Sequence, residues 1–255
     1  MKEDLRSFYD NHKNFSDRRL SEYYLSPGIR CKFDLLNKYI KNLNSFDIGI
    51  DLGCSGNSFL YFTDKVRKKC FFDIAIKPLI QYVSNAIFNP SCGDLTRLPF
   101  RKESFDFISA LDVLEHVFND KLAISEISRI LKDRGVVLVT IPHSMKNFSK
   151  QDEIIGHYRR YELDQIVEMF KENGLKPFKT FGVYGQLMRI EKIQSKDPEK
   201  LEDNLTKLRM KYDSNLLFQK IWRVFVWIAA KVMRIDVKHQ PLDKIMNIGI
   251  AFQKQ

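Results

Sequence analysis

Four acidic residues follow apolar segments at regular intervals, and their carboxylates could serve one ligand. Asp51, Asp73, Asp94 and Asp112 lie 18 to 22 residues apart, each at or near the end of a strand-like run. That rhythm is typical of successive strand, helix, strand units. Ligands of open parallel sheets bind at the carboxyl ends of the strands, so we expect the four acids along one binding edge. A carboxylate there can accept hydrogen bonds from both hydroxyl groups of a ribose.

A glycine-bearing turn follows the first of these acids. The segment reads Asp51-Leu-Gly-Cys-Ser-Gly-Asn57. Gly53 and Gly56 allow a ligand to approach the backbone closely, and a helix beginning near Ser58 would direct free N–H groups at an anionic group. Such turns also occur for structural reasons alone, so this one predicts a cofactor loop only together with the acids.

Three further motifs make the pattern specific. They are Gly93-Asp-Leu-x-x-Leu-Pro-Phe100, Ser104-Phe-Asp106 and Asp112-Val-Leu-Glu-His116. Over residues 48–177 the chain resembles class I S-adenosylmethionine-dependent methyltransferases of the small-molecule type, which include ubiquinone and sugar O-methyltransferases. The resemblance implies a Rossmann-like, doubly wound α/β fold with a seven-stranded, mostly parallel sheet and an antiparallel last strand.

The resemblance also implies the cofactor S-adenosylmethionine and the residues that hold it. The first turn would hold the methionine part, Asp73 the ribose, and the third loop the adenine. The residues implied are Asp51, Gly53, Cys54, Ser55, Gly56, Asp73, Ile74, Asp94, Leu95 and Leu111. The family's Asp-x-Gly-x-Gly-x-Gly turn has Ser55 and Asn57 here at its second and third glycine positions. Asparagine tolerates a positive φ, so we expect a left-handed Asn57 and a slightly rearranged cofactor.

His116 is the candidate base for an acceptor hydroxyl. In phosphoethanolamine-type methyltransferases a histidine at the matching place pairs with a tyrosine of an N-terminal lid, which implies Tyr23 or Tyr24 here. The alternative is a histidine that only supports its loop. His143, Tyr24, and His157 with Arg159 of a Gly-His-x-Arg-x-aromatic segment are assigned to the acceptor, although the arginines of that segment could equally anchor the loop.

The reaction implied is an in-line displacement, which alignment of the two substrates can accelerate. It needs no metal ion, and no metal ligand is assigned. Nucleic acid is an unlikely acceptor, because Ala110-Leu-Asp112 does not match the Asn/Asp-Pro-Pro-aromatic motif of enzymes that methylate base amines. The expected acceptor is therefore a small molecule.

Composition agrees with a globular enzyme. The chain has 255 residues, a net charge of +10 and 44% apolar residues. Its four scattered cysteines form no Cys-x-x-Cys pair, which argues against a disulfide framework or a zinc site, and the N-terminus has no signal-peptide core. Both observations favour a cytoplasmic location. The basic surplus lies mainly in residues 144–240, where nineteen basic residues stand against thirteen acidic ones. This surplus suits a phosphate-bearing substrate, an anionic membrane surface, RNA or a merely solvated face.

The domain organisation follows from these elements. Residues 1–46 are expected to form a helical lid and a packing helix that starts at Ser26-Pro27, and residues 47–184 the cofactor-binding core. A further helix is expected to end near Gly135, another to cover 161–173, and the closing strand to lie in 245–255.

Residues 185–244 read as a helical insertion, and its segment 216–235 is mostly apolar. Lys220, Arg223, Lys231 and Arg234 share one stripe of that helix. Four basic residues make a membrane-spanning helix unattractive, so contact with a membrane surface or with a greasy acceptor explains the pattern better. The alternative is a dimer contact or a packed helix with one wet edge. The oligomeric state stays open.

Two rival functions remain. A nicotinamide-dependent oxidoreductase would share the sheet but expects Gly-x-Gly-x-x-Gly, whereas this turn offers only Gly53-x-x-Gly56. A non-catalytic protein that binds RNA or membranes could keep the fold without turnover, and the altered glycine turn is the one feature that favours it.

Overall fold

A seven-stranded sheet forms the centre of the computed structural model, which describes residues 5–83, 88–188 and 198–255. Its strand order is β3-β2-β1-β4-β5-β7-β6, and β1 to β5 are parallel while β7 pairs antiparallel with both β5 and β6. The predicted doubly wound fold is confirmed. The strands are β1 Phe46–Leu52, β2 Val66–Asp73, β3 Phe88–Cys92, β4 Phe105–Leu111, β5 Leu131–Pro142, β6 Leu175–Tyr184 and β7 Asn247–Lys254.

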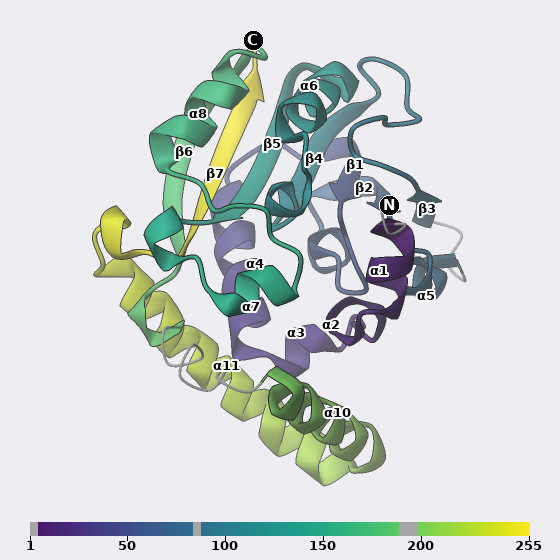
Figure 1. The fold of residues 1–255 in the computed structure, drawn as a ribbon, viewed down its shortest axis with the longest axis vertical. Helices are drawn as coiled ribbons and strands as arrows, with labels where there is room; N and C mark the ends of the chain where they lie inside the picture. Colours follow the sequence, from purple (N-terminus) through teal and green to yellow (C-terminus); the bar gives the residue numbers. More distant parts are fainter. Residues whose placement is uncertain (1–4, 84–87, 189–197) are drawn as a thin grey trace.

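Helices surround the sheet and gather beyond one of its edges (Figure 1). Those nearest the N-terminus are α1 Leu5–Asn11, α2 Lys13–Ser16, α3 Glu22–Leu25, α4 Pro27–Ile40 and α5 Ile80–Val83. The later ones are α6 Asp120–Ile130, α7 Lys150–Ile154, α8 Leu163–Lys171, α10 Pro198–Ser214 and α11 Leu216–Lys238. Short 3-10 turns lie at Phe59–Phe62, Lys77–Leu79, Leu114–His116, Met145–Asn147, Gln186–Met188 and Leu242–Lys244.

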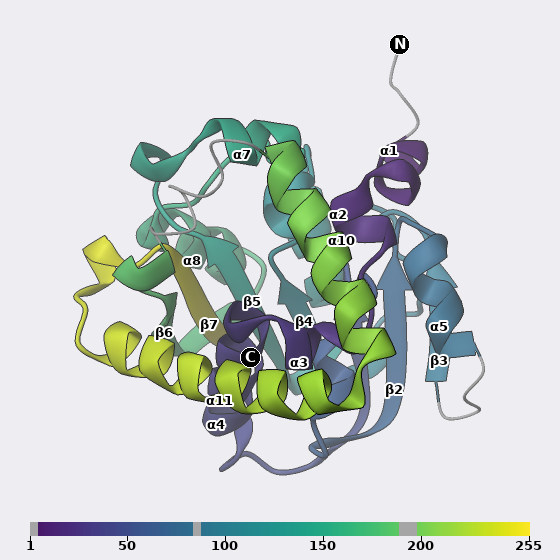
Figure 2. The ribbon, with the colours of Figure 1, turned by 90° about the horizontal axis from the view of Figure 1, so that it is seen from below.

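Both faces of the sheet are buried under apolar side chains. On one face α6 and α8 contribute Ile124, Ile127 and Phe170 to a core with the strands. On the other face α4 contributes Phe33 and Leu36. The helix α11 forms a third layer, because it packs on the outer side of α4 (Figure 2).

The structure corrects several expected boundaries. No helix begins near Ser58, because the chain makes only the 3-10 turn Phe59–Phe62 before β2. The helix α6 ends at Ile130 rather than near Gly135, since pairing of Leu131 with Phe105 draws the following residues into β5. The helix α8 starts at Leu163, because Tyr161 instead bridges to His143.

Candidate functional site

The four predicted acids do lie along the carboxyl ends of neighbouring strands. Asp51 is in β1 and Asp73 ends β2, while Asp94 and Asp112 follow β3 and β4. Helices α1 to α3 and α7 lie beyond this edge (Figure 1). The sheet therefore presents one acidic rim that the N-terminal segment can cover.

The glycine turn after β1 is shaped by close packing. Gly53 has φ +69°, and a Cβ atom there would lie 2.3 Å from a methyl carbon of Val113. A Cβ on Gly56 would lie 1.7 Å from the carbonyl oxygen of Arg18. The left-handed residue in the middle of the turn is Ser55, with φ +47°, and not Asn57 as predicted. A side chain at Gly53 would displace Val113, and a side chain at Gly56 would displace the backbone of Arg18.

Asp51 organises this turn from below. Its carboxylate accepts hydrogen bonds from the hydroxyl groups of Ser58 and Ser109 and from the backbone N–H of Phe59. Burial raises the pKa of Asp51 to about 6 despite these donors. Because its oxygens already have partners within the chain, Asp51 shapes the loop rather than projecting into open space.

Asp73 is positioned differently. One carboxylate oxygen accepts the Ser55 N–H at 2.8 Å and the other accepts the Ala75 N–H at 2.9 Å. Burial raises its pKa. The Ile74 backbone N–H is a third donor to this carboxylate, which has about four lone-pair sites in all. The side chain is therefore fixed by the backbone and keeps lone-pair capacity for a ligand hydroxyl.

Ser55 supplies a direct test of whether a ligand fits here. Its hydroxyl oxygen is buried and has no hydrogen-bond partner among the described residues. A buried polar atom without a partner is costly, and a bound ligand can supply the missing hydrogen bond. The turn therefore fits a polar ligand that reaches Ser55, as the methionine end of S-adenosylmethionine would.

The remaining predicted cofactor residues surround the same edge. The Cys54 thiol is buried, and its backbone N–H is held by the Phe72 carbonyl group at 3.1 Å. Asp94 is exposed and accepts from the Thr96 backbone and hydroxyl, whereas Leu95 is buried. Ile74 and Leu111 are half-buried, so each presents part of its side chain near the rim.

Segments from the N-terminus close over the rim. The Asp10 carboxylate accepts the backbone N–H groups of Ile76 and Lys77, both at 2.9 Å, and Leu20 N–H donates to Gln81. The segment from α1 to α3 is thus fixed to the loop after β2. We call residues 5–25 the roof.

A partly buried ion pair joins the sheet to α4 inside the site. The Lys32 ammonium group donates to Asp112 at 2.7 Å, and Thr140 and Asn247 donate to the other oxygen of that carboxylate. Burial alone would raise the pKa of Asp112, but Lys32 and these donors lower it to about 2. The Asp112 carboxylate is therefore charged at neutral pH and locked in place.

His116 lies under the roof, and its tyrosine partner differs from the prediction. The Tyr9 hydroxyl lies 3.1 Å from Nδ1 of His116. Tyr23 instead donates to Asp34 at 2.7 Å, and the Tyr24 ring lies under the Arg223 guanidinium group. The expected lid tyrosine exists, but Tyr9 in α1 provides it, because α3 is turned towards α4 and α11.

The Gly156 to Tyr161 segment both anchors its loop and reaches His116. Arg159 pairs with Asp120 at 2.7 Å, while Arg160 and the His157 Nδ1 atom both contact the Asp152 carboxylate. The His157 and His116 rings lie 4.5 Å apart. Of this segment, His157 and the Gly156 backbone lie beside the candidate base.

His143 serves the fold at the end of β5. Its Nδ1 atom lies 3.1 Å from the Ile245 carbonyl oxygen, and its backbone N–H donates to Met246. The side chain is buried. It ties β5 to the segment before β7, and its role towards an acceptor stays a prediction.

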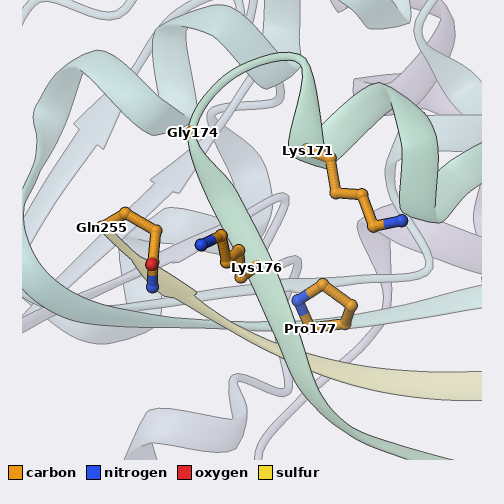
Figure 3. Close-up of a pocket in the computed structure, with 5 residues that line it drawn as sticks. All are labelled: Lys171, Gly174, Lys176, Pro177 and Gln255. Carbon is orange, nitrogen blue, oxygen red and sulfur yellow. The ribbon is translucent and has the colours of Figure 1, made fainter.

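A cavity of about 370 Å³ lies at the other end of the strands, where β6 begins and β7 ends. Figure 3 shows Lys176 extending towards Gln255 at its wall, whereas Lys171 extends the other way. These residues lie at the end of α8, the start of β6 and the end of β7, and they include none of the predicted site residues. Within the described part of the chain, the acidic rim forms no comparable open pocket, because the roof packs directly on the glycine turn.

Sequence reasoning missed three residues of the site: Tyr9, Arg18 and Lys32. Burial lowers the pKa of Arg18, and the nearby carboxylates of Glu22 and Asp112 oppose that shift. The aromatic-rich N-terminus was a usable signal for Tyr9. Nothing in the spacing connects Lys32 with Asp112, which is 80 residues away.

Comparisons with known proteins agree with this geometry. The methyltransferase domain family matches residues 50–139. An uncharacterized protein of Methanocaldococcus jannaschii is 27% identical over 71% of this chain and 74% of its own length. A probable S-adenosylmethionine-dependent methyltransferase of Mycolicibacterium smegmatis is 28% identical over 36% of this chain and 37% of its own.

A solved structure extends the likeness to nearly the whole chain. Phosphoethanolamine N-methyltransferase 2 of Haemonchus contortus, crystallised with S-adenosylmethionine, aligns with a TM-score of 0.64 and 18% identity. The alignment covers 98% of this chain and 60% of that one, and at this identity it shows a shared fold. The family model thus identifies a methyltransferase domain over residues 50–139, built on the seven-stranded sheet of class I S-adenosylmethionine-dependent methyltransferases.

Proposed function

We propose that this methyltransferase acts on the hydroxyl group of a small molecule that is apolar or lipid-linked. One observation carries the proposal. The contact between Asp73 and Ser55 and the contact between His116 and Tyr9 lie at the same end of the sheet, under the roof. The first pair suits the cofactor and the second suits an acceptor. S-adenosylmethionine supplies a methyl group on a positively charged sulfur, which a lone pair of the acceptor can displace.

The cofactor is assigned to residues by their hydrogen-bonding capacity. Asp73 would accept the ribose hydroxyls, and Ser55 and the backbone around Gly53 and Gly56 would hold the methionine part. Leu95 and Leu111 would border the adenine, with Asp94 accepting from its amino group. Asp51 and Cys54 would support the turn from within, and Ile74 would pack beside the ribose.

Isothermal titration calorimetry tests this assignment. We expect S-adenosylmethionine and S-adenosylhomocysteine to bind and NAD not to bind. Asp73→Asn should weaken binding at least tenfold, because it replaces a charge-assisted acceptor. Asp64→Asn, at an exposed acid on the chain before β2, is the matched control and should leave binding unchanged. Failure of both sulfur compounds to bind, or equal weakening by the two substitutions, would contradict the assignment.

His116 is the proposed acceptor-facing residue, and burial decides how it can act. Burial lowers the pKa of His116 to about 3, so the imidazole is neutral at physiological pH. A neutral ring can accept a proton, but a group with this pKa is a weak base at neutral pH. The acceptor hydroxyl must therefore be acidic, or another group must assist.

The acceptor can be sought without knowing its identity. Cell extract incubated with the protein and S-adenosylmethionine should contain a component that gains the mass of one methylene group. The gain should disappear with Asp73→Asn and persist with Asp64→Asn. A methyl group added to an oxygen atom supports O-methylation, whereas a methyl group added to a nitrogen atom would overturn that part of the proposal.

We further propose that α11 brings the enzyme to a membrane surface that holds the acceptor. Among the described residues no helix is long and apolar enough to cross a membrane. Exposed apolar residues nevertheless recur along one face of α11 at helical spacing. They are Leu217, Ile221, Val224, Ile228, Val232 and Ile235.

The basic stripe of α11 is divided between the protein and the solvent. Arg223 donates to the Tyr212 hydroxyl at 2.6 Å, and Arg234 pairs with Asp34, so both basic groups turn towards the protein. Val226 and Ala230 are buried, and Ala230 packs with Cys31 and Leu35 of α4. The apolar face is left outside, with Lys220 and Lys231 exposed near it. An apolar face with lysines at its margin suits an anionic lipid surface.

Vesicle flotation tests the membrane contact. The full chain should float with vesicles that contain phosphatidylglycerol more than with pure phosphatidylcholine. Ile228→Glu should abolish flotation, whereas Leu122→Glu, at an exposed leucine of α6, should not. Equal flotation of the two variants would contradict the proposal. Sedimentation of the wild type as a dimer that Ile228→Glu dissociates would assign the face to a second copy instead.

A further inference from the structure

We propose that Glu115, His116 and His157 bind a divalent transition-metal ion beside the acceptor site. Each of the three offers a ligand atom, and these atoms lie within 4.8 Å of one another. Two imidazole nitrogens and one carboxylate oxygen form a donor set that suits Zn²⁺ and neighbouring first-row metals. The sequence had assigned no metal ligand, and the three residues come from two separate loops.

The Glu115 carboxylate lacks a partner that its burial demands. The side chain is 1% exposed, and its Oε2 atom has no hydrogen-bond donor among the described residues. Its Oε1 atom lies 3.8 Å from Nε2 of His157, which is too far for a hydrogen bond. A buried carboxylate without donors is costly, whereas a cation between these atoms would stabilise it.

His157 is oriented as metal-binding histidines usually are. Its Nδ1 atom lies 2.8 Å from Oδ1 of Asp152, so that carboxylate fixes the ring orientation and leaves Nε2 directed at Glu115. Metal-bound histidines commonly donate their other ring N–H to such a carboxylate. Asp152 is itself fixed by Arg160 and Ser149. Asp152 and its partners therefore hold the His157 ring in a fixed orientation.

The place of the site suggests its use. Glu115 and His116 follow β4 in the same loop as Asp112, and Tyr9 of the roof contacts His116. Three protein ligands leave coordination positions open, as in catalytic zinc sites. An ion there would lower the pKa of an acceptor hydroxyl that binds at an open position.

This use rests on the proposed function, although metal binding itself does not. With the ion bound, His116 serves as a ligand and the hydroxyl proton passes to water. The acceptor oxygen then forms its bond to the methyl carbon as the sulfur–carbon bond breaks, and S-adenosylhomocysteine leaves. Charge and atoms balance, because the sulfonium loses its positive charge and one proton is released.

Metal binding can be measured directly on the full chain. The protein is dialysed against chelator and titrated with Co²⁺, whose visible absorption reports coordination, and Zn²⁺ is then added as a competitor. We expect one equivalent of Co²⁺ to bind and Zn²⁺ to displace it. Glu115→Gln and His157→Gln should each weaken binding at least tenfold, and Asp152→Asn by about 10- to 100-fold. His239→Gln, at an exposed histidine after α11, is the control and should bind as the wild type does.

Two further measurements keep the test decisive. Circular dichroism establishes that each variant is folded, and Glu115→Gln preserves the shape of the side chain if Asp152→Asn fails to fold. Co²⁺ affinity that is equal in wild type, Glu115→Gln and His157→Gln would overturn the proposal. S-adenosylhomocysteine binding is measured in parallel, so loss of the metal site and loss of the methyltransferase assignment give separate results.

Discussion

At the scale of single residues, two acids of the same rim are held in opposite ways. Asp51 accepts from two hydroxyl groups and a backbone N–H, all within the chain. Asp73 accepts from the backbone N–H groups of Ser55, Ala75 and Ile74, and keeps lone-pair capacity for a ligand. The motif predicts that both residues belong to the cofactor loop. It cannot separate the acid that shapes the loop from the acid that can bind, because that depends on which donors the fold brings close.

Ser55 gives a prediction at this scale. Ser55→Gly should stabilise the free protein by about 1 kcal/mol, because a left-handed residue loses its Cβ strain. The same change should weaken S-adenosylmethionine binding by about 2- to 12-fold, the value of one net hydrogen bond. Thermal unfolding and calorimetry measure the two effects.

Ser55→Ala is the matched comparison for this prediction, since it removes the hydroxyl group and keeps Cβ. It should weaken binding as Ser55→Gly does. Both variants lose the costly unpaired hydroxyl, so the extra stability of Ser55→Gly over Ser55→Ala, about 1 kcal/mol, reports the Cβ strain. Unchanged affinity in both variants would show that the Ser55 hydroxyl has no role in the cofactor site. The sequence singled out Ser55 as a departure but placed the positive φ at Asn57, because the backbone conformation follows the Asp73 contact and not residue preference.

At the scale of elements, α4 matters more than its hydrophobic face suggests. Its start at Pro27 and its apolar face could be predicted, since capping and periodicity are local. Its contribution of Lys32 to Asp112 could not, because the two residues meet only when α4 packs on the sheet. The same limit applies to α11. Periodicity identified two faces, but contacts of Arg223 and Arg234 with distant residues decide which face is buried.

Lys32→Met tests the link between α4 and β4. Removing Lys32 deletes a charge-assisted hydrogen bond to the partly buried Asp112, so the free energy of unfolding should fall by about 1.5–3 kcal/mol. Lys38→Met, at an exposed lysine of the same helix, is the control and should change stability by less than about 0.5 kcal/mol. Urea unfolding measures both values.

The pH dependence of that variant adds a second check. In the wild type the pKa of Asp112 is about 2, so its stabilising contribution is present above pH 3.8, the unfolded value, and is lost as pH falls towards 2. Without Lys32 the pKa of Asp112 should rise above 3.8, so protonation would relieve the buried charge. The loss of stability in Lys32→Met should therefore be larger at pH 7 than at pH 4.5. An equal loss at both values would contradict the electrostatic explanation.

At the scale of the whole molecule, two segments far apart in the sequence meet beside the site. The roof, residues 5–25, comes from the N-terminus, and α10 comes from the insertion before β7. Arg209 of α10 donates to Glu22 at 2.7 Å in a buried pair, and Arg19 pairs with Asp213 at 2.7 Å in an exposed one. Figure 2 shows α10 running beside α2 and α3. The insertion therefore connects the roof with α11, so the element that carries the apolar face also contacts the segment over the acceptor site.

This arrangement predicts that Arg209 controls opening of the roof. Arg209→Met leaves Glu22 buried without its cation, at a cost of about 3 kcal/mol, so amide hydrogens in residues 5–25 should exchange about a hundredfold faster. Arg19→Met breaks the exposed pair, worth at most about 1 kcal/mol, and should accelerate the same amides less than about fivefold. Hydrogen exchange followed by mass spectrometry compares the two variants. Equal acceleration would mean that the roof opens independently of α10, and a faster exchange spread evenly over β1, β4 and β5 would indicate global unfolding instead of a moving roof.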